Sequence, residues 1–219
     1  MIGATGAVGS EALKVLTQMD SVARVTVLGR RPLEGVSSEK IAQHIVDLFD
    51  PETYRAYLPG HTSAICTLGV GEPSKVSKEQ FIKIDKTLPL QFATLCKAAG
   101  VEHFQLLSSV GANSKSGSFF LRSKGELEDD LRHINFQRLS LFHPSMILTP
   151  ENRYGLSQAV VLAVWPLLDP ILFGRLRKFR GIKVADLGAA IARNIVSSGV
   201  GTQTLEWDDI AKFRRSEIG

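Results

Sequence analysis

Short apolar runs alternate with helix-like patterns along most of this sequence. The runs are strand-like because each spans only a few residues and is rich in branched or aromatic side chains. They lie at residues 25–28, 41–46, 62–67, 104–107, 137–142 and 202–206, and we expect the last at an edge of the sheet. Strands that alternate with helices are typical of a parallel sheet covered by helices on both faces. The pattern therefore predicts an α/β fold with a doubly wound sheet, in a single domain of 219 residues.

Several helix ends can be predicted from their capping residues. Asp50 followed by Pro51 is typical of a helix start, because Asp accepts an amide proton and Pro fits the first turn. Ser77 and Gln80 predict a capping box that opens a helix running to about residue 99, which Gly100 then ends. Further helices are expected at residues 119–134, at 184–198 and from 207 onward.

The sequence begins with a G-x-x-G-x-x-G loop between an apolar start and a helix-like run. Glycines in this loop let the main chain turn sharply, approach a ligand closely and pack the next helix against the sheet. Amide groups at the start of that helix would face an anion, here a dinucleotide pyrophosphate. We expect the cofactor contacts of the loop to come from Gly3, Thr5, Gly6, Ala7, Val8 and Gly9.

Only Met1 and Ile2 precede the glycine loop, whereas a strand usually has about five residues. In a doubly wound sheet this first strand is central and should be the best buried. Two explanations stay open. Either the sequence starts inside a longer one, or the central strand is cut short and the fold is weaker there.

Arg30 and Arg31 follow the strand at residues 25–28. NAD-specific sites carry an acidic residue at the end of this strand, where it accepts hydrogen bonds from the ribose hydroxyls. Two guanidinium groups would instead bind a 2′-phosphate. We therefore expect NADP(H) rather than NAD(H), with a solvated loop as the alternative for this arginine pair.

Other residues expected near the cofactor follow the carboxyl ends of the later strands, where open α/β sheets bind ligands. Asp47 and Leu48 are suited to contacting the adenine. Small residues around Gly69 would let the main chain pass close to the nicotinamide ribose. The remaining expected contacts are Thr67, Leu68, Ser108, Pro144 and Ser145.

Composition and charge exclude several other classes of protein. The net charge of +4 suits an anionic ligand, and without a zinc-finger spacing, an RNA-binding aromatic signature or a basic arm we expect no nucleic-acid partner. Cys66 and Cys96 lie in apolar segments, which favours buried thiols over a disulfide or a metal pair. Because the glycine loop stands at the amino end, with no signal peptide before it, we expect a cytoplasmic protein.

The sequence resembles the atypical short-chain dehydrogenase/reductases, and within them the branch of the human Tat-interacting oxidoreductase and its bacterial relatives. The stretches that carry the resemblance are 2–6, 28–31, 106–112, 124–128 and 142–144. They lie in register from Met1 to about Leu148. The resemblance implies a Rossmann domain, an NADP(H) site and a sheet of order 3-2-1-4-5-6 extended by an edge strand.

Enzymes of this superfamily use a serine, a tyrosine and a lysine, the last two spaced Y-x-x-x-K. By resemblance, Lys124 would bind the nicotinamide ribose, and Ser109 or Ser108 would hold the substrate oxygen. The tyrosine position holds Phe120, whose ring cannot donate a proton. The alternative for Lys124 is an exposed helix lysine that pairs with Glu128, four residues on.

Another group would have to replace the missing tyrosine if the protein is a catalyst. His143 stands where the family has an arginine before proline, and its imidazole could act near neutral pH. Its alternative is a packed, hydrogen-bonded residue at a strand end. Tyr154, on the loop after the sixth strand, and water are further candidates.

Residues 149–183 are expected to form a small lobe, inserted before the last helices and strand. Within it, 156–173 is almost continuously apolar, interrupted by Pro166, Asp169 and Pro170 and followed by several basic residues. One reading is a pair of helices that cover the substrate cleft and pack on the domain or on a second subunit, as in a homodimer. The other is reversible attachment of 156–183 to an anionic membrane surface.

Two functions follow from these observations. The first is an NADP(H)-dependent reductase of a small carbonyl compound, with Ser109, Lys124 and His143 as catalytic candidates. The second is a non-catalytic protein that senses NADPH and presents its carboxyl-terminal lobe to a protein partner.

Overall fold

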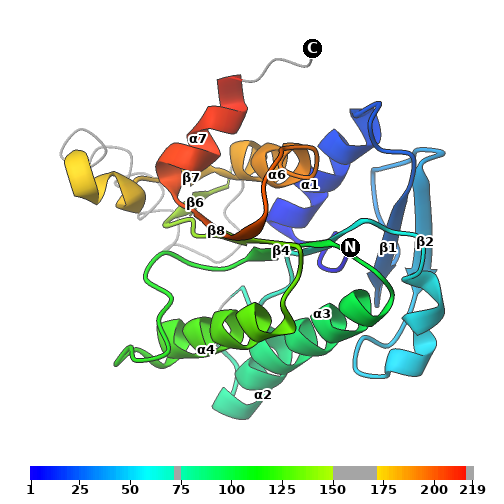
Figure 1. Ribbon diagram of the computed structural model, residues 1–219, viewed down its shortest axis with the longest axis horizontal. Coiled ribbons are helices and arrows are strands. Elements are labelled where there is room, and N and C mark those ends of the chain that lie inside the picture. Colours follow the sequence, from blue (N-terminus) through cyan, green and yellow to red (C-terminus); the bar gives the residue numbers. More distant parts are fainter. Residues whose placement is uncertain (72–74, 150–171, 216–219) are drawn as a thin grey trace.

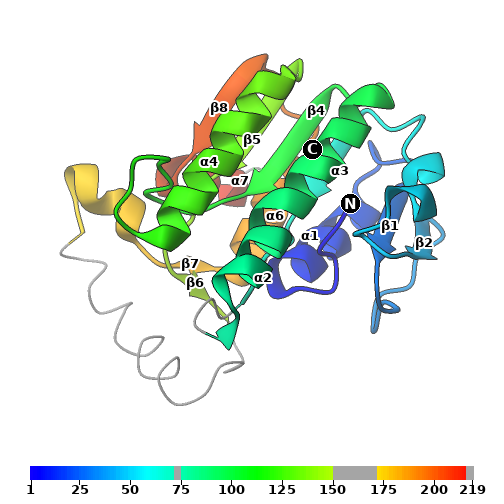
Figure 2. The same cartoon turned by 90° about the horizontal axis from the view of Figure 1, so that it is seen from below.

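The computed structural model describes residues 1–71, 75–149 and 172–215. Its strands are parallel and lie in the order β2 (Ile41–Ile45), β1 (Val25–Gly29), Ile2, β3 (Ser63–Cys66), β4 (His103–Leu107), β5 (Arg138–Phe142) and β8 (Gly201–Leu205). Figures 1 and 2 show this sheet with helices on both faces. The expected Rossmann fold and strand order are confirmed.

The central strand of the sheet is reduced to one bridging residue. Ile2 forms isolated parallel bridges to Leu28 of β1 and to Cys66 of β3. Its amide donates to the Ile65 carbonyl at 3.0 Å, and its carbonyl accepts from the Thr67 amide at 3.1 Å. The sheet therefore consists of a two-stranded and a four-stranded part, joined at Ile2.

Two apolar cores lie on opposite faces of the sheet (Figures 1 and 2). α1 (Ala7–Gln18), α6 (Val184–Arg193) and α7 (Trp207–Arg215) cover one face, and α2 (Lys78–Ile82), α3 (Leu88–Ala98) and α4 (Phe119–Ile134) cover the other. Leu13, Leu187 and Ile191 are buried in the first core. Phe92 and Phe104 are buried in the second. Burial of both faces explains why the inner strands β1 and β3 are apolar runs, whereas the outer strands β2 and β8 are half-buried to exposed.

The predicted helices agree with the structure except in two segments. Asp50 caps a 3₁₀ helix, Pro51–Thr53, by accepting from the Glu52 amide. Ser77 and Gln80 form the expected capping box at the start of α2. Between α2 and α3, however, the chain forms a π-helical turn, η4 (Lys83–Thr87), which the sequence did not predict. The helix predicted at 184–198 is also shorter, since α6 ends at Arg193.

Most of the predicted lobe at 149–183 lies outside the described residues, including Tyr154 and nearly all of the apolar stretch. Two short strands flank it, β6 (Ile147–Leu148) and β7 (Ile182–Lys183), and a 3₁₀ helix, η5 (Gly174–Phe179), precedes β7. Arg177 of η5 pairs with Asp208 at 2.7 Å. Among the described helices, none is both long enough and apolar enough to cross a membrane.

Both cysteines are free and buried, as expected. Burial raises the pKa of the Cys66 thiol to about 11 and that of the Cys96 thiol to about 12. These side chains therefore contribute to packing as neutral thiols.

Candidate functional site

The glycine loop is pressed against the carboxyl end of β3. Gly3 has a φ of +85°, and a Cβ at this position would lie 2.5 Å from the carbonyl carbon of Thr67. A Cβ on Gly9 would lie 2.1 Å from the Gly3 carbonyl oxygen and 2.6 Å from the Thr67 Oγ1. Only glycine fits these two positions. The loop therefore has the close backbone approach that dinucleotide sites require.

Helix α1 begins directly after this loop and presents an uncapped amino end. Its N-cap is Gly6, which makes no side-chain hydrogen bond to the first turn. The first amides of a helix have no partner within it, and the positive end of the helix dipole lies there. Thr5 and Gly6 are exposed at this point. The loop and helix together offer a site for a phosphate group.

The two arginines after β1 lie at the same edge of the sheet as the glycine loop. Both side chains are exposed, and in the part of the chain that the structure describes neither guanidinium has an ion-pair partner. The Arg31 carbonyl accepts a hydrogen bond from the Gln43 side chain at 3.0 Å, which fixes the backbone here. The guanidinium groups are thus available to an anionic ligand.

Asp47 and Leu48 follow β2 at this edge. Asp47 is exposed, and its Oδ1 accepts from the Phe49 amide at 2.9 Å, which shapes the loop. Leu48 is buried beneath that loop. The structure therefore brings both to the expected edge, with Asp47 as the side chain open to a ligand.

Lys124 is buried and pairs with an acidic residue that the sequence analysis did not single out. Its Nζ lies 2.9 Å from Asp85 Oδ1, and both side chains are at most 6% exposed. Asp85 Oδ2 also accepts from the Val70 amide at 2.7 Å. The alternative of an exposed lysine that pairs with Glu128 is wrong.

Gly69 places this ion pair beside the expected ribose position. A Cβ on Gly69 would lie 3.2 Å from Asp85 Oδ1 and 3.9 Å from Lys124 Nζ. Asp85 reaches this position from the π-helical turn η4, a type of turn that is frequent at functional sites. The local sequence did not mark Asp85, because Lys83 and Lys86 flank it in a helical segment of mixed polarity.

Phe120 lies on the same face of α4 as Lys124, as the Y-x-x-x-K spacing predicts. Its half-buried ring is 5.8 Å from the ring of Phe81 on α2. The facing helical segments thus match in register: Phe81 opposes Phe120, and Asp85 opposes Lys124 four residues on. The tyrosine position is therefore occupied by a packed phenyl ring.

Glu128 joins Ser108 and His143 in a second buried cluster. Ser108 Oγ donates to Glu128 Oε1, and His143 Nε2 lies 2.7 Å from the same oxygen. Arg132 pairs with the other carboxylate oxygen, Oε2, at 3.2 Å. Glu128 is 2% exposed and His143 is 7% exposed. The contacts of His143 match the reading of a hydrogen-bonded strand-end residue, and its acid role stays a prediction.

Ser109 is the more available of the two candidate serines. It is half-buried, and within the described parts of the chain its hydroxyl makes only a long contact of 3.4 Å to the Val110 carbonyl. The Pro144 carbonyl accepts from the Val110 amide at 3.0 Å and so holds this loop against the end of β5. Ser145 is half-buried nearby in the chain. A ligand oxygen at this edge would meet Ser109 rather than Ser108.

These features define a dinucleotide-binding protein of the Rossmann class. Residues 3–136 match the model of the NAD(P)H-binding family. The chain is 35% identical over 213 residues to Protein HTATIP2 of Rattus norvegicus, covering 94% of this chain and 84% of the relative. It is 30% identical over 209 residues to Protein FMP52, mitochondrial, of Debaryomyces hansenii, covering 92% and 90% of the two chains. The chain therefore belongs to the NAD(P)H-binding family.

Solved structures of lower identity share the fold. MoeE5 in complex with UDP-glucose and NAD has a TM-score of 0.70 at 16% identity, over 93% of this chain and 73% of that one. The NADPH-dependent quinone oxidoreductase QOR2 of Escherichia coli, complexed with NADPH, has a TM-score of 0.66 at 18% identity, over 94% and 67%. The chain therefore has the same fold as these two NAD- and NADPH-bound proteins.

Proposed function

We propose that this protein binds NADP(H) along the carboxyl edge of the sheet. The glycine loop and the start of α1 would hold the pyrophosphate, Arg30 and Arg31 the 2′-phosphate, and Lys124 the nicotinamide ribose. The observation that carries the proposal is the pair of exposed guanidinium groups, which have no ion-pair partners among the described residues. They lie at the end of β1, where the residue type determines whether a site prefers NADP or NAD. The close backbone contacts at Gly3 and Gly9, which leave no room for a Cβ, fit the same cofactor.

We further propose that the site reduces a small carbonyl compound. Bound NADPH would supply the hydride. The Ser109 hydroxyl would donate a hydrogen bond to the carbonyl oxygen, and Lys124 would hold the ribose and stabilise negative charge that develops nearby. His143 is held by Glu128, so water is our first candidate for the proton, ahead of His143 and Tyr154.

A non-catalytic NADPH sensor is the second candidate, because Phe120 removes the usual proton donor while leaving the proposed binding residues in place. Such a protein would report the ratio of NADPH to NADP⁺ through a partner that contacts its carboxyl-terminal lobe. NADPH consumption with a panel of small aldehydes and ketones separates the two functions. Turnover with any of them supports the reductase, and binding without turnover across the panel supports the sensor.

Thermal unfolding with NADPH, with NADH and without cofactor tests the binding proposal directly. A ligand at a hundredfold excess over its Kd stabilises the native state by about 2.7 kcal/mol. We expect NADPH to raise the unfolding midpoint by more than NADH does. Equal shifts would overturn the assignment of Arg30 and Arg31, and no shift with either cofactor, in a folded sample, would overturn the site.

A further inference from the structure

The 3₁₀ helix η5 lies at the periphery of the molecule, where Figures 1 and 2 show it in yellow. A 3₁₀ helix has three residues per turn, so side chains at positions i and i+3 project from the same side. The Leu176 amide donates to the Phe173 carbonyl at 3.1 Å, and the Arg180 amide donates to the Arg177 carbonyl at 3.0 Å. The i to i+3 spacing therefore holds from residue 173 to residue 180, and the segment has three sides.

One side of η5 is an exposed apolar row. It consists of Phe173, Leu176 and Phe179, each three residues from the next, and these side chains are 71%, 50% and 37% exposed. A 3₁₀ helix rises about 2 Å per residue, so the row is roughly 12 Å long. Apolar side chains on one side of a surface helix, all open to solvent, indicate a surface that is covered by something else.

A second side of η5 fixes the helix on α7. The guanidinium groups of Arg177 and Arg180 lie over the Trp207 ring, 5.4 Å and 5.2 Å from its centroid. Arg177 also pairs with Asp208 at 2.7 Å, and the Trp207 indole donates to the Gly181 carbonyl at 3.1 Å. Because residues 177 and 180 occupy a different side from the apolar row, these contacts hold the row away from α7.

The surroundings of the apolar row are basic. Residues 172–183 contain five basic residues and no acidic one. Arg175 and Lys183 are exposed, and neither has an ion-pair partner among the residues that the structure describes. Lys178 reaches Glu206 only at 3.7 Å. The segment therefore combines exposed apolar side chains with an excess of positive charge.

The size of this surface favours a lipid bilayer over a protein as the occupant. A stable protein interface buries about 800 Å² on each partner, far more than one short row of three side chains provides. Attachment to a bilayer surface needs only shallow insertion of a few apolar side chains, helped by basic residues that attract anionic headgroups. The charge of the segment complements such headgroups.

We propose that the side of η5 formed by Phe173, Leu176 and Phe179 docks reversibly on an anionic membrane surface. The three apolar side chains enter the boundary between headgroups and acyl chains. Arg175 and Lys178 stay at the level of the headgroups, because their long stems let the charged ends reach lipid phosphates and carboxylates. Apolar insertion and charge attraction are each weak here, so binding needs both and is sensitive to salt.

The experiment measures how much of the full chain pellets with vesicles. One set of vesicles is phosphatidylcholine with about 30% phosphatidylserine, and the other is phosphatidylcholine alone. Each is used at about 0.1 M and about 0.5 M salt, which shortens the screening length from about 10 Å to about 4 Å. No cofactor is added, so failure here says nothing against NADP(H) binding.

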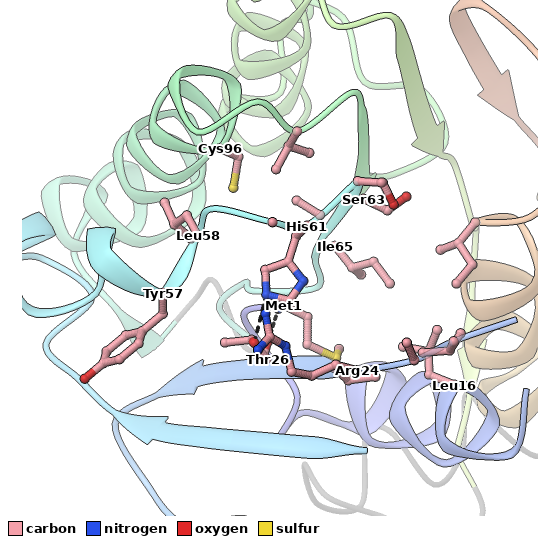
Figure 3. Close-up of a pocket in the computed structure, with 18 of the residues that line it drawn as sticks. Met1, Leu16, Arg24, Thr26, Tyr57, Leu58, His61, Ser63, Ile65 and Cys96 are labelled. Carbon is pink, nitrogen blue, oxygen red and sulfur yellow. Dashed lines mark hydrogen bonds between the residues drawn. The ribbon is translucent and has the colours of Figure 1, made fainter. Parts of the chain in front are cut away.

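The variants separate the apolar contribution from the charge. Phe173→Ser with Leu176→Ser removes most of the row. Its matched control replaces Val196 and Val200 with Ser. These valines are 56% and 75% exposed, and they precede β8 at the amino edge of the sheet, where Val196 lines the cavity of about 630 Å³ between β1 and β3 (Figure 3).

Arg175→Gln removes the unpaired charge beside the row. Its control is Lys115→Gln, because Lys115 is likewise exposed and has no ion-pair partner within the described residues. All of these side chains are on the surface, so each variant should keep the unfolding midpoint of the wild type. If the double serine variant nevertheless fails to fold, the Arg175 variant and the salt series still decide.

We expect the wild type to pellet with the anionic vesicles at low salt and far less at high salt or with phosphatidylcholine alone. The Phe173 and Leu176 variant should lower the partition coefficient by roughly tenfold or more, since it removes two large apolar side chains. Arg175→Gln should lower it by roughly fivefold at low salt, the effect of one basic residue near an anionic surface. Both controls should bind like the wild type.

Three results would overturn the proposal. The first is no pelleting with anionic vesicles, or equal pelleting with both kinds. The second is unchanged binding of the Phe173 and Leu176 variant, which would place a membrane contact elsewhere on the chain. The third is a dimer in sedimentation that this variant converts to a monomer while vesicles bind neither, because a second copy of the chain would then cover the row.

Discussion

The Lys124 ammonium lies 2.9 Å from the Asp85 carboxylate, in a buried ion pair that joins α4 to the π-helical turn between α2 and α3. The same carboxylate holds the Val70 amide, which belongs to the loop after β3. Asp85 therefore positions the lysine and fixes the backbone beside Gly69. A cofactor ribose at this edge would meet an ammonium group whose direction is already set.

Asp85→Asn is expected to destabilise the fold by about 3–5 kcal/mol, since it leaves the Lys124 ammonium buried without a counter-charge. Asparagine still offers an oxygen to the Val70 amide, so the loss reports on the ion pair. Adding Lys124→Met should restore most of the stability, because an apolar side chain replaces the unpaired charge. Urea unfolding of the two single variants and the double variant measures the coupling. Additive effects would show that the pair does not stabilise the fold.

Replacing both Arg30 and Arg31 with Ala is expected to weaken NADPH binding by roughly tenfold to a hundredfold, since hydrogen bonds to charged groups contribute about 1.5–3 kcal/mol. NADH binding should change little, because it has no 2′-phosphate. Fluorescence titration with each cofactor gives the two affinities. Replacing both Arg55 and Lys14 with Ala removes two exposed cations that pair with Glu52 and Glu11, and so serves as the control for net charge. Parallel losses for NADPH and NADH would place the 2′-phosphate elsewhere.

Gly9→Ala is expected to cost about 1–3 kcal/mol of stability and most of the cofactor binding, because its Cβ would lie 2.1 Å from the Gly3 carbonyl oxygen. Gly117→Ala is the matched control, since a Cβ there meets nothing within 4 Å. Chemical unfolding and the thermal shift with NADPH measure both effects. A Gly9 variant as stable as the Gly117 variant would show that the loop can move away from β3.

The alternation of strands with helices and the glycine loop were predictable from the sequence because both depend on local rules, whereas the strand order was expected only from the family resemblance. Apolar runs of strand length show where strands alternate with helices. The close contacts at Gly3 and Gly9 leave glycine as the one residue that fits at each position. The roles of the charged residues on α4 were not predictable in this way. Lys124 and Glu128 are spaced for a surface pair, yet the buried face of the helix directs Lys124 to Asp85 and Glu128 to Ser108 and His143.

The burial of Asp85 and its pairing with Lys124 were not predictable, because the position of Asp85 depends on a π-helical turn. Helical periodicity assumes a constant turn, and the extra residue in η4 shifts the face on which Asp85 lies. The burial of its partner, Lys124, is likewise a tertiary effect. The spacing of Lys124 and Glu128 alone is that of an exposed surface pair. Lys124 is buried instead because α4 packs against α2 and η4.

Phe120→Tyr is expected to raise the reduction of small carbonyl compounds by roughly a hundredfold or more if a missing acid limits the reaction, since a positioned acid contributes about 10²–10⁴. The new hydroxyl would stand on the Lys124 face of α4. Phe119→Tyr is the control, because its ring also packs on Phe81, at 5.5 Å, but lies one position away. NADPH consumption measures the rates. Equal activity of the two variants would show that the acid lies elsewhere or that reduction is not the function.

His103 makes stability depend on pH. Its ring is buried in β4 with Nε2 2.9 Å from Ser140 Oγ, and burial, followed by the charge of Arg138, lowers its pKa from 6.5 to about 3. Below pH 6.5 the His103 ring is protonated in the unfolded state but stays neutral in the folded state. The contribution of His103 to the free energy of unfolding is therefore complete above pH 6.5 and is lost as the pH falls toward 3.

His103→Gln keeps a hydrogen-bonding side chain but cannot titrate. Urea unfolding at a series of pH values should therefore show the wild-type stability falling relative to the variant by about 1.4 kcal/mol per pH unit below pH 6.5. Other titrating groups change both proteins alike and cancel in the difference. A difference that stays constant from pH 7 to pH 4 would mean that the His103 ring takes up its proton in the folded protein, and that the space around Ser140 admits the charge.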